Sequence, residues 1–315
     1  MPKPFGPRRT RTQNRTDMPG FVVVRSLSRL CGPKRSGLVL RYNRPAAPYL
    51  PYLHRLNMMV AAQPSPRRQV PILGVAIDDV TEAEAVALAD SMIGAGGPHQ
   101  ICTVNPEFVM EAWRSPAFAA VLAAAKLRTP DGFGLLLAAR YLGTPLRGRV
   151  TGVALTDRLA ALAAARGYRL FLLGAAPGVA QAAGAALQAR YPGLTIVGAF
   201  AGSPHPRHEP FLRQLIAAAR PDILLVAYGH PRQDLWIARN QPALGVPLAV
   251  GVGGVFDELA GRVPLAPSWM QRLGLKWLFR LMTQPQRLPR IIDAVPRFMW
   301  QVVRHGHTAP RQQSA

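Results

Sequence analysis

Cysteine, acidic residues and long apolar runs are all scarce in this 315-residue chain. Its two cysteines, Cys31 and Cys102, lie far apart, which argues against a disulfide framework or a cysteine-rich metal site and indicates a reducing compartment. No stretch of about 18 uncharged apolar residues is present, so we expect no membrane-spanning helix. The basic N-terminal region lacks the apolar stretch and cleavage site that are typical of a signal peptide.

Several motifs for metals and nucleotides are absent as well. The chain contains no Asp-x-Asp, the spacing with which many nucleotide-sugar enzymes hold a divalent metal, and no His-Glu-x-x-His. His205 and His208 are three residues apart in a proline-rich stretch and fit a surface loop better than a metal site. The dinucleotide fingerprint and the P-loop are also missing. We therefore expect neither a metal nor a cofactor, and we expect cationic groups or helix N-termini to neutralise any leaving group.

Acidic residues are outnumbered by basic ones, 16 against 38, which gives a formal net charge of +22. The excess is confined to the two ends, because residues 1–70 carry +13, residues 262–315 carry +8 and residues 71–261 carry only +1. A nucleic-acid-binding protein usually carries its basic patch on the folded domain, so we expect no nucleic-acid partner. The C-terminal block is also rich in Trp, Leu, Phe and Met, a combination that favours an anionic membrane surface.

These differences predict four parts. Residues 1–68 are rich in Arg, Pro and Ser without a steady period, and we expect a basic, disordered leader; translation beginning at Met58 or Met59 is an alternative. Residues 69–262 form an α/β domain, residues 263–305 an amphipathic helical appendage, and residues 306–315 a disordered tail. In the appendage, apolar residues recur at intervals of three and four, and this stripe serves either membrane association or ordinary core packing.

The central part alternates short apolar runs with helical segments. We expect strands over residues 70–77, 100–104, 126–129, 168–173, 194–198, 222–227 and 246–250. We expect helices over residues 81–93, from 106 onward, and over 132–141, 156–166, 178–190, 208–219 and 232–240. Strands separated by helices of about ten residues predict a Rossmann-like α/β fold, with a mostly parallel sheet and helices on both faces.

Small polar residues stand where two of these strands end. Thr103 and Asn105 close one strand, and Asp131 follows another within Pro-Asp-Gly. Ligands of open α/β sheets bind beyond the carboxyl ends of strands, and a carboxylate there can act as a general base, although Pro-Asp-Gly is more often a simple turn. Two alternatives stay open: Gly174 begins either a phosphate-binding turn or an ordinary strand end, and Arg149 is either a phosphate ligand or a solvated side chain.

A series of short motifs resembles a known family. The motifs are T-V-N-P at 103–106, P-D-G at 130–132, R-V-T-G at 149–152, F-L-L-G at 171–174, Y-G-H-P-R-Q-D at 228–234, G-V-G-G-V-F-D at 251–257 and A-P-S-W-M-Q-R-L-G-L-K-W-L-F-R at 266–280. In this order and spacing, over about residues 70–290, the chain resembles the WecG/TagA/CpsF family of glycosyltransferases (glycosyltransferase family 26).

The resemblance implies an inverting, metal-independent hexosyltransferase. Its donor would be a UDP-sugar carrying an N-acetylmannosamine-type sugar, glucose or a uronic acid. Its acceptor would be a polyprenyl-diphosphate-linked sugar in exopolysaccharide or cell-envelope polysaccharide synthesis. The protein would lie in the cytoplasm, peripheral on the inner face of the cytoplasmic membrane, as a monomer or as a homo-oligomer. A basic nucleic-acid-binding protein and a non-catalytic scaffold of a polysaccharide assembly complex are the alternatives.

The resemblance also implies residue roles. Asp131 resembles the general base, and Thr103 and Asn105 resemble active-site polar residues around it. The implied substrate-binding residues are Arg149, Gly174, Tyr228, Gly229, Gln233, Gly253, Gly254, Arg272, Arg280 and Arg287. The sequence departs from the family pattern at four positions. These departures do not change the expected reaction class, but they leave the identity of the donor and the acceptor open. The four positions are Ala154, Asp234, Leu265 and Lys276.

Overall fold

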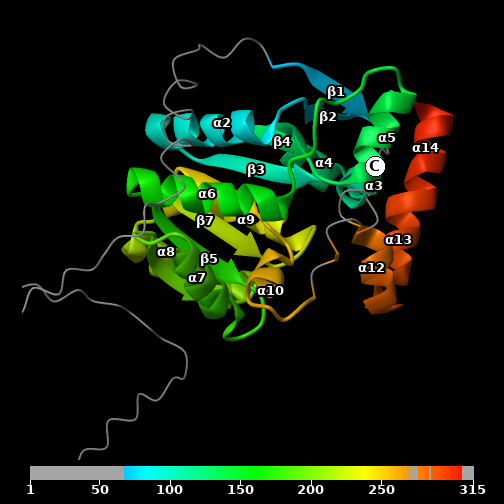
Figure 1. Cartoon of the computed structure of the whole chain (residues 1–315). Helices are drawn as coiled ribbons and strands as arrows, with labels where there is room; N and C mark the ends of the chain where they lie inside the picture. The colour runs from blue at the N-terminus through cyan, green and yellow to red at the C-terminus, as the bar shows by residue number, and fades with distance from the viewer. Residues whose placement is uncertain (1–66, 265, 268–269, 271–275, 284, 307–315) are drawn as a thin grey trace, which may run out of the picture.

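The computed structural model describes residues 67–264, 266–267, 270, 276–283 and 285–306 (Figure 1). The strands are β1 (Gln69–Ile72), β2 (Val75–Asp78), β3 (His99–Val104), β4 (Leu127–Pro130), β5 (Arg169–Gly174), β6 (Thr195–Phe200), β7 (Ile223–Ala227) and β8 (Leu248–Gly251). The helices of the α/β domain are α2 (Glu82–Ala95), α3 (Pro106–Arg114), α4 (Pro116–Ala124), α5 (Phe133–Tyr141), α6 (Gly152–Arg166), α7 (Val179–Arg190), α8 (Glu209–Ala219), α9 (Arg232–Leu244) and α10 (Val255–Leu259).

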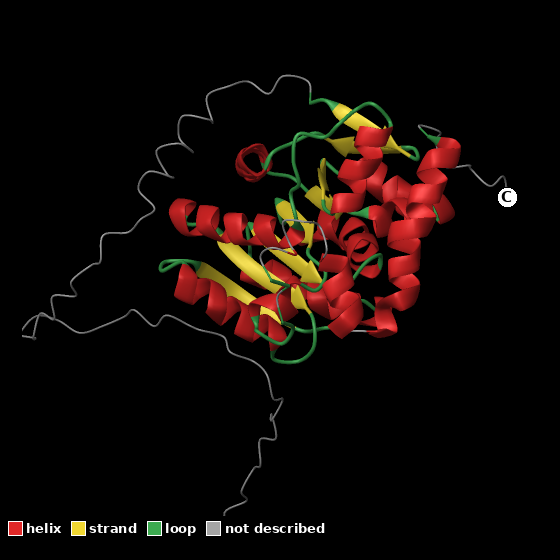
Figure 2. Cartoon of the chain, turned by 45° about the vertical axis from the view of Figure 1, so that its right-hand side comes forward, coloured by secondary structure: helices red, strands yellow, loops and turns green. Residues whose placement is uncertain are grey.

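Six strands form one parallel sheet in the order β4-β3-β8-β7-β5-β6 (Figures 1 and 2). This arrangement confirms the predicted Rossmann-like α/β fold. Because every strand runs the same way, all six carboxyl ends meet at one edge of the sheet, where ligands of such folds bind. The predicted strand ends at Thr103 and Asp131 therefore lie on neighbouring strands, with Val104 paired to Pro130.

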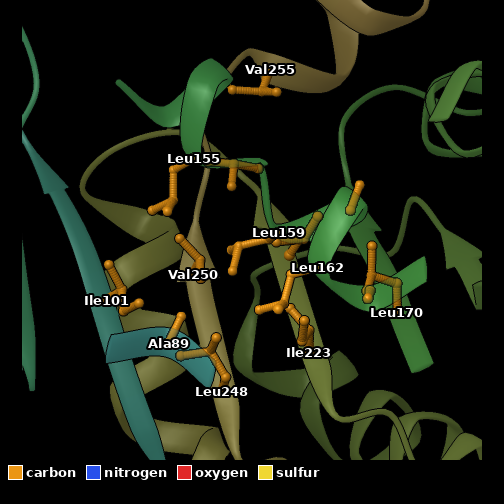
Figure 3. Close-up of a cluster of buried hydrophobic side chains, with 14 of the residues drawn as sticks. Ala89, Ile101, Leu155, Leu159, Leu162, Leu170, Ile223, Leu248, Val250 and Val255 are labelled. Atoms are coloured by element: carbon orange, nitrogen blue, oxygen red, sulfur yellow. The ribbon is translucent and has the colours of Figure 1, made fainter. Parts of the chain in front are cut away.

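Helices cover both faces of the sheet because successive strand residues point to opposite sides. Ile101 lies in the apolar cluster beneath α2, α6 and α7, whereas its neighbour Cys102 packs on the other face. On the first face, Leu155, Leu159 and other side chains of α6 pack against the strands (Figure 3). Each fully buried Leu or Ile contributes about 1.5–3 kcal/mol, so this cluster fixes where α6 begins relative to the sheet.

Three expected elements differ from the structure by more than two residues: the strand over 70–77, the start of α6, and the end of α9, which runs to Leu244 and not to residue 240. Residues 70–77 form a hairpin rather than one strand, because Leu73 and Gly74 both adopt positive φ, 50° and 81°, and turn the chain between β1 and β2. Helix α6 begins at Gly152, four residues earlier than expected, because the Thr151 side chain accepts a hydrogen bond from the Ala154 N–H and caps the helix. The motif R-V-T-G thus ends inside a helix.

Within the predicted C-terminal appendage, the described residues form several short helical elements. These elements are α12 (Lys276–Thr283), the 3₁₀ turn η2 (Pro285–Arg287), α13 (Leu288–Ile292), the π-helical turn η3 (Asp293–Arg297) and α14 (Phe298–His305). Prolines begin η2 and lie inside η3, where a missing N–H interrupts regular α-helical bonding. The predicted leader up to residue 66 and the predicted tail from residue 307 lie outside the described residues.

Helix α14 packs onto the α/β domain. Phe298 and Val302 are fully buried in a cluster with Phe108 of α3 and Leu135 of α5. An ion pair between Arg114 and Asp293, 2.9 Å long, joins α3 to η3. Among the described residues, no helix combines the length and the apolar character needed to cross a bilayer.

Candidate active site

Asp131 lies at the carboxyl edge of the sheet and is held from two sides. Its backbone N–H donates to the carbonyl of Val104 at 2.6 Å, which joins the ends of β3 and β4. Its carboxylate Oδ2 accepts a hydrogen bond from the backbone N–H of Gly152 at 3.0 Å. Because Gly152 is the first residue of α6, the positive end of that helix faces the carboxylate and favours its ionised form.

Thr103 and Asn105, the two polar residues predicted beside Asp131, shape the same edge. The Thr103 hydroxyl donates to the carbonyl of Gly251 at 3.3 Å, so it links the ends of β3 and β8. A Cβ added at Gly152 would lie 3.5 Å from that hydroxyl, which places Thr103 beside the start of α6. The Asn105 side chain caps α3 by accepting from the Phe108 N–H at 3.2 Å.

The turn after β8 is supported by the predicted residue Gln233. This side chain is only 2% exposed, and its Oε1 accepts a hydrogen bond from the Gly253 N–H at 2.9 Å. Gly251 allows the close approach, because a Cβ there would come within 2.7 Å of the Gln233 Nε2. Among the described residues, no atom lies within 4 Å of the position that a side chain would take at Gly253 or Gly254, so this part of the turn borders space that those residues leave open.

Tyr228 and Gly174 are placed by packing. Tyr228 is 8% exposed and packs edge-on against Trp236, and burial raises the pKa of its hydroxyl. Gly174 adopts a φ of 113°, and a Cβ there would lie 2.7 Å from the backbone carbon of Ala227. Packing alone therefore accounts for a tyrosine at 228 and a glycine at 174. Substrate binding by either residue stays a prediction. Gly229, which follows Tyr228, has a φ of 77° and open space around it.

The structure gives different amounts of detail for the four arginines predicted to bind substrate. Arg149 is half-buried and lies two residues before the Thr151 cap of α6. Arg272 lies outside the described residues, and Arg280 and Arg287 are described only as positions in α12 and η2. In the part of the chain that the structure describes, no group of three or more His, Cys, Asp or Glu side chains could hold a metal ion.

Two residues that sequence reasoning missed hold the chain segment in front of α6. The backbone N–H of Arg147 donates to Asp79 Oδ1 at 2.7 Å, and its guanidinium bonds Glu84 at 2.7 Å. Although burial alone would raise it, the hydrogen bond from Arg147 lowers the pKa of Glu84. Asp79 is 2% exposed. The visible signal was the pair of acids directly after residues 70–77, of which Asp79 has its partner 68 residues onward and Asp78 bonds Arg128, 50 residues onward.

A buried carboxylate lies directly beneath the supported turn. Asp234 is fully buried, and one of its oxygens would lie 2.6 Å from a Cβ added at Gly251. Burial raises the pKa of Asp234 to about 7, and the neighbouring Cys102 thiol has a pKa well above its usual value, also because of burial. Sequence reasoning noted Asp234 only as a departure from the family pattern and assigned it no role.

Comparison with known proteins identifies the family of this chain. The model of the glycosyl transferase WecG/TagA/CpsF family matches residues 70–312. The chain belongs to this family of glycosyltransferases. The family resemblance and the enzyme class that the motifs predicted are therefore confirmed.

Curated members of the WecG/TagA/CpsF family show what similar proteins do. A protein of Bacillus spizizenii is 35% identical over 211 residues, which cover 67% of this chain and 81% of the relative. A protein of Staphylococcus aureus is 29% identical over 248 residues, which cover 78% of this chain and 96% of the relative. Both are named N-acetylglucosaminyldiphosphoundecaprenol N-acetyl-beta-D-mannosaminyltransferase. The relatives thus act on a lipid-linked acceptor in which N-acetylglucosamine carries a diphosphate.

Proposed function

We propose that this chain transfers N-acetylmannosamine from a UDP-sugar to polyprenyl-diphosphate-linked N-acetylglucosamine, during synthesis of an exopolysaccharide or cell-envelope polysaccharide. The observation that carries the proposal is the Asp131 carboxylate, which the Gly152 N–H holds at the carboxyl edge of the sheet. The names of the relatives support the two sugars.

Asp131 is the general base of the proposed reaction. It takes the proton of an acceptor hydroxyl while that oxygen forms a bond to the anomeric carbon of the donor sugar. The bond between the anomeric carbon and the UDP oxygen breaks on the opposite face, so the configuration is inverted. The N-terminus of α6 orients the carboxylate and stabilises its negative charge before the proton arrives.

The departing UDP needs positive charge and backbone donors close to its phosphates. The turn at Gly253 and Gly254, held by Gln233, is suited to approach the donor, since no atom of the described residues occupies the positions that side chains would take there. Arg149 and the C-terminal residues Arg272, Arg280 and Arg287 would supply guanidinium groups, whose forked geometry matches a diphosphate. In this proposal the reaction needs no metal ion.

The C-terminal helices bring the enzyme to its lipid-linked acceptor. Residues 259–315 contain Asp293 as their single acid, so their charge suits an anionic cytoplasmic face of the membrane. Large apolar side chains such as Trp277, Met282 and Trp300 are exposed on these helices, at 38%, 74% and 61%. Basic and exposed apolar groups together are typical of segments that lie on a membrane surface.

The test is a donor panel with the full chain. UDP-N-acetylmannosamine, UDP-N-acetylglucosamine, UDP-glucose and UDP-glucuronic acid are each incubated with N-acetylglucosamine diphosphate attached to a lipid. We expect acceptor-dependent UDP release with UDP-N-acetylmannosamine, a disaccharide-lipid product, and the same rate in the presence of EDTA. Release with a different donor would correct the sugar, and absence of release with every donor would contradict the proposed function.

A further inference from the structure

Exposed large apolar side chains gather in one part of the molecule. Among the residues that the structure describes, ten such side chains are exposed, and nine of them lie on α5 or on the C-terminal helices. The tenth, Phe211, lies on α8. In Figure 1, α5 and the C-terminal helices stand together at one end of the molecule. Such concentration marks an interaction surface, because scattered exposed apolar residues would be spread over all elements.

Helix α5 is the part of this surface that belongs to the catalytic domain. Phe133, Leu137 and Tyr141 are four residues apart and therefore share one face, with exposed fractions of 40%, 44% and 58%. The opposite face of α5 is used for folding, since Leu135 and Ala138 are fully buried. The exposed apolar stripe is therefore not needed to pack α5 onto the core.

The stripe begins beside the candidate base. Phe133 is the second residue after Asp131, and α5 extends from there for nine residues, about 13 Å at 1.5 Å per residue. A Cβ added at Gly134 would lie 3.8 Å from the Phe298 ring, so α5 runs against α14. The helix therefore connects the catalytic edge to the basic C-terminal helices.

The chain segment that contains α5 carries charge of one sign. Residues 132–156 contain no acidic residue, and Arg140 on α5 is exposed. A lipid-linked acceptor presents its sugar first, then a diphosphate and then an apolar chain. When the sugar hydroxyl lies at Asp131, a basic and apolar path that starts there matches the remaining order of groups.

We propose that the exposed stripe of α5, formed by Phe133, Leu137 and Tyr141, binds the first isoprene units of the acceptor's polyprenyl chain. This inference rests on the proposed function. The stripe takes the chain as it leaves the active site, so the lipid contributes to acceptor recognition and not only to retention at the membrane.

The test uses two water-soluble acceptors without any bilayer. Both carry N-acetylglucosamine diphosphate, one esterified to methanol and one to a chain of three isoprene units. The wild type and the double variant Leu137→Gln/Tyr141→Gln are compared as full chains, and Phe211→Gln on α8 is the matched control. We expect the wild type and the control to prefer the isoprenyl acceptor in kcat/KM, and the double variant to lose about tenfold of that preference while using the methyl acceptor normally.

Each other result would overturn the inference in a recognisable way. An unchanged preference in the double variant, with activity intact, excludes the stripe as a chain site. Equal losses on both acceptors show that the stripe supports the active site instead. Vesicle binding and self-association of the same variants are measured separately. If the double variant keeps its acceptor preference and loses only vesicle binding, the stripe belongs to the bilayer; if it loses only self-association, the stripe belongs to a second copy. A wild type that transfers sugar to neither acceptor contradicts the proposed function itself.

Discussion

The backbone N–H of Gly152 lies 3.0 Å from the carboxylate Oδ2 of Asp131, although 21 residues separate them in the sequence. This contact places the carboxylate at the N-terminus of α6. The position of α6 is fixed in turn by the apolar cluster on the first face of the sheet and by the Arg147–Asp79 hydrogen bond in front of the helix. The orientation of the candidate base thus depends on packing throughout the domain.

We expect Gln233→Ala to reduce activity more than the loss of folded protein alone would explain. The variant removes the acceptor of the Gly253 N–H and releases the turn after β8, and misplacing a substrate-positioning turn costs about 10- to 100-fold in kcat/KM for the donor. Gln241→Ala is the matched control, because Gln241 is also a buried glutamine of α9 but bonds the carbonyls of His99 and Val246 at the opposite edge of the sheet. Urea denaturation and donor kinetics measure both variants.

We expect both glutamine variants to lose about 1–3 kcal/mol of stability, because each leaves a buried partner unsatisfied. Activity per folded molecule should fall for Gln233→Ala alone. Equal activity in the two variants would show that Gln233 has no special role in the site.

Gly174→Ala and Gly178→Ala separate packing from phosphate binding in the turn after β5. Both glycines have positive φ, so each substitution costs about 1–2 kcal/mol in backbone strain. Only Gly174→Ala also drives a Cβ to 2.7 Å from Ala227, which adds about 1–3 kcal/mol of overpacking. Thermal unfolding should therefore rank Gly174→Ala as clearly less stable. Equal stability combined with lost donor binding in Gly174→Ala would instead favour a phosphate-binding turn.

The raised pKa of Asp234 predicts how the stability of the protein depends on pH. Burial raises its pKa to about 7 from 3.8, so between these values the unfolded chain loses a proton that the folded chain keeps. Wild-type stability from this group therefore falls as the pH rises from about 4 to about 7, and then levels. Asp234→Asn has no proton to lose, and its stability relative to wild type should rise over that interval by up to about 4 kcal/mol.

The comparison is made by urea denaturation of Asp234→Asn and the wild type at pH 5, 6, 7 and 8. Other titrating groups are common to both proteins and cancel in the difference. A stability difference that stays constant across this range would contradict the buried, protonated state of Asp234.

Local patterns predicted much of the fold. The helix expected from residue 81 begins with a capping box between Thr81 and Glu84, a pattern that is visible in the sequence because both partners lie within one helical turn. The hairpin at Leu73 was missed, since an unbroken apolar run hides a turn that only the following glycine permits. The start of α6 was missed because its cap, Thr151, stands in a stretch with glycine and arginine that also fits a loop.

The site was predictable only in part, for a related physical reason. Thr103 and Asp131 could be placed together because parallel strands bring their carboxyl ends to one edge. The support of Gly253 by Gln233 and of Arg147 by Asp79 connects residues 20 and 68 positions apart, and no periodicity encodes such contacts. The burial of Phe298 likewise depends on where α14 meets α3 and α5, which the amphipathic pattern alone does not specify.

The most direct test of the account is the steady-state rate of UDP release by Asp131→Asn, with lipid-linked acceptor and the donor that the panel selects. Asparagine keeps the size of the side chain and an oxygen for the Gly152 N–H, but it cannot take the acceptor's proton. We predict a kcat lower by about 10²- to 10⁴-fold, with the same folded stability and a donor KM within about threefold of wild type. A variant that releases UDP at close to the wild-type rate would contradict the assignment of Asp131 as the general base.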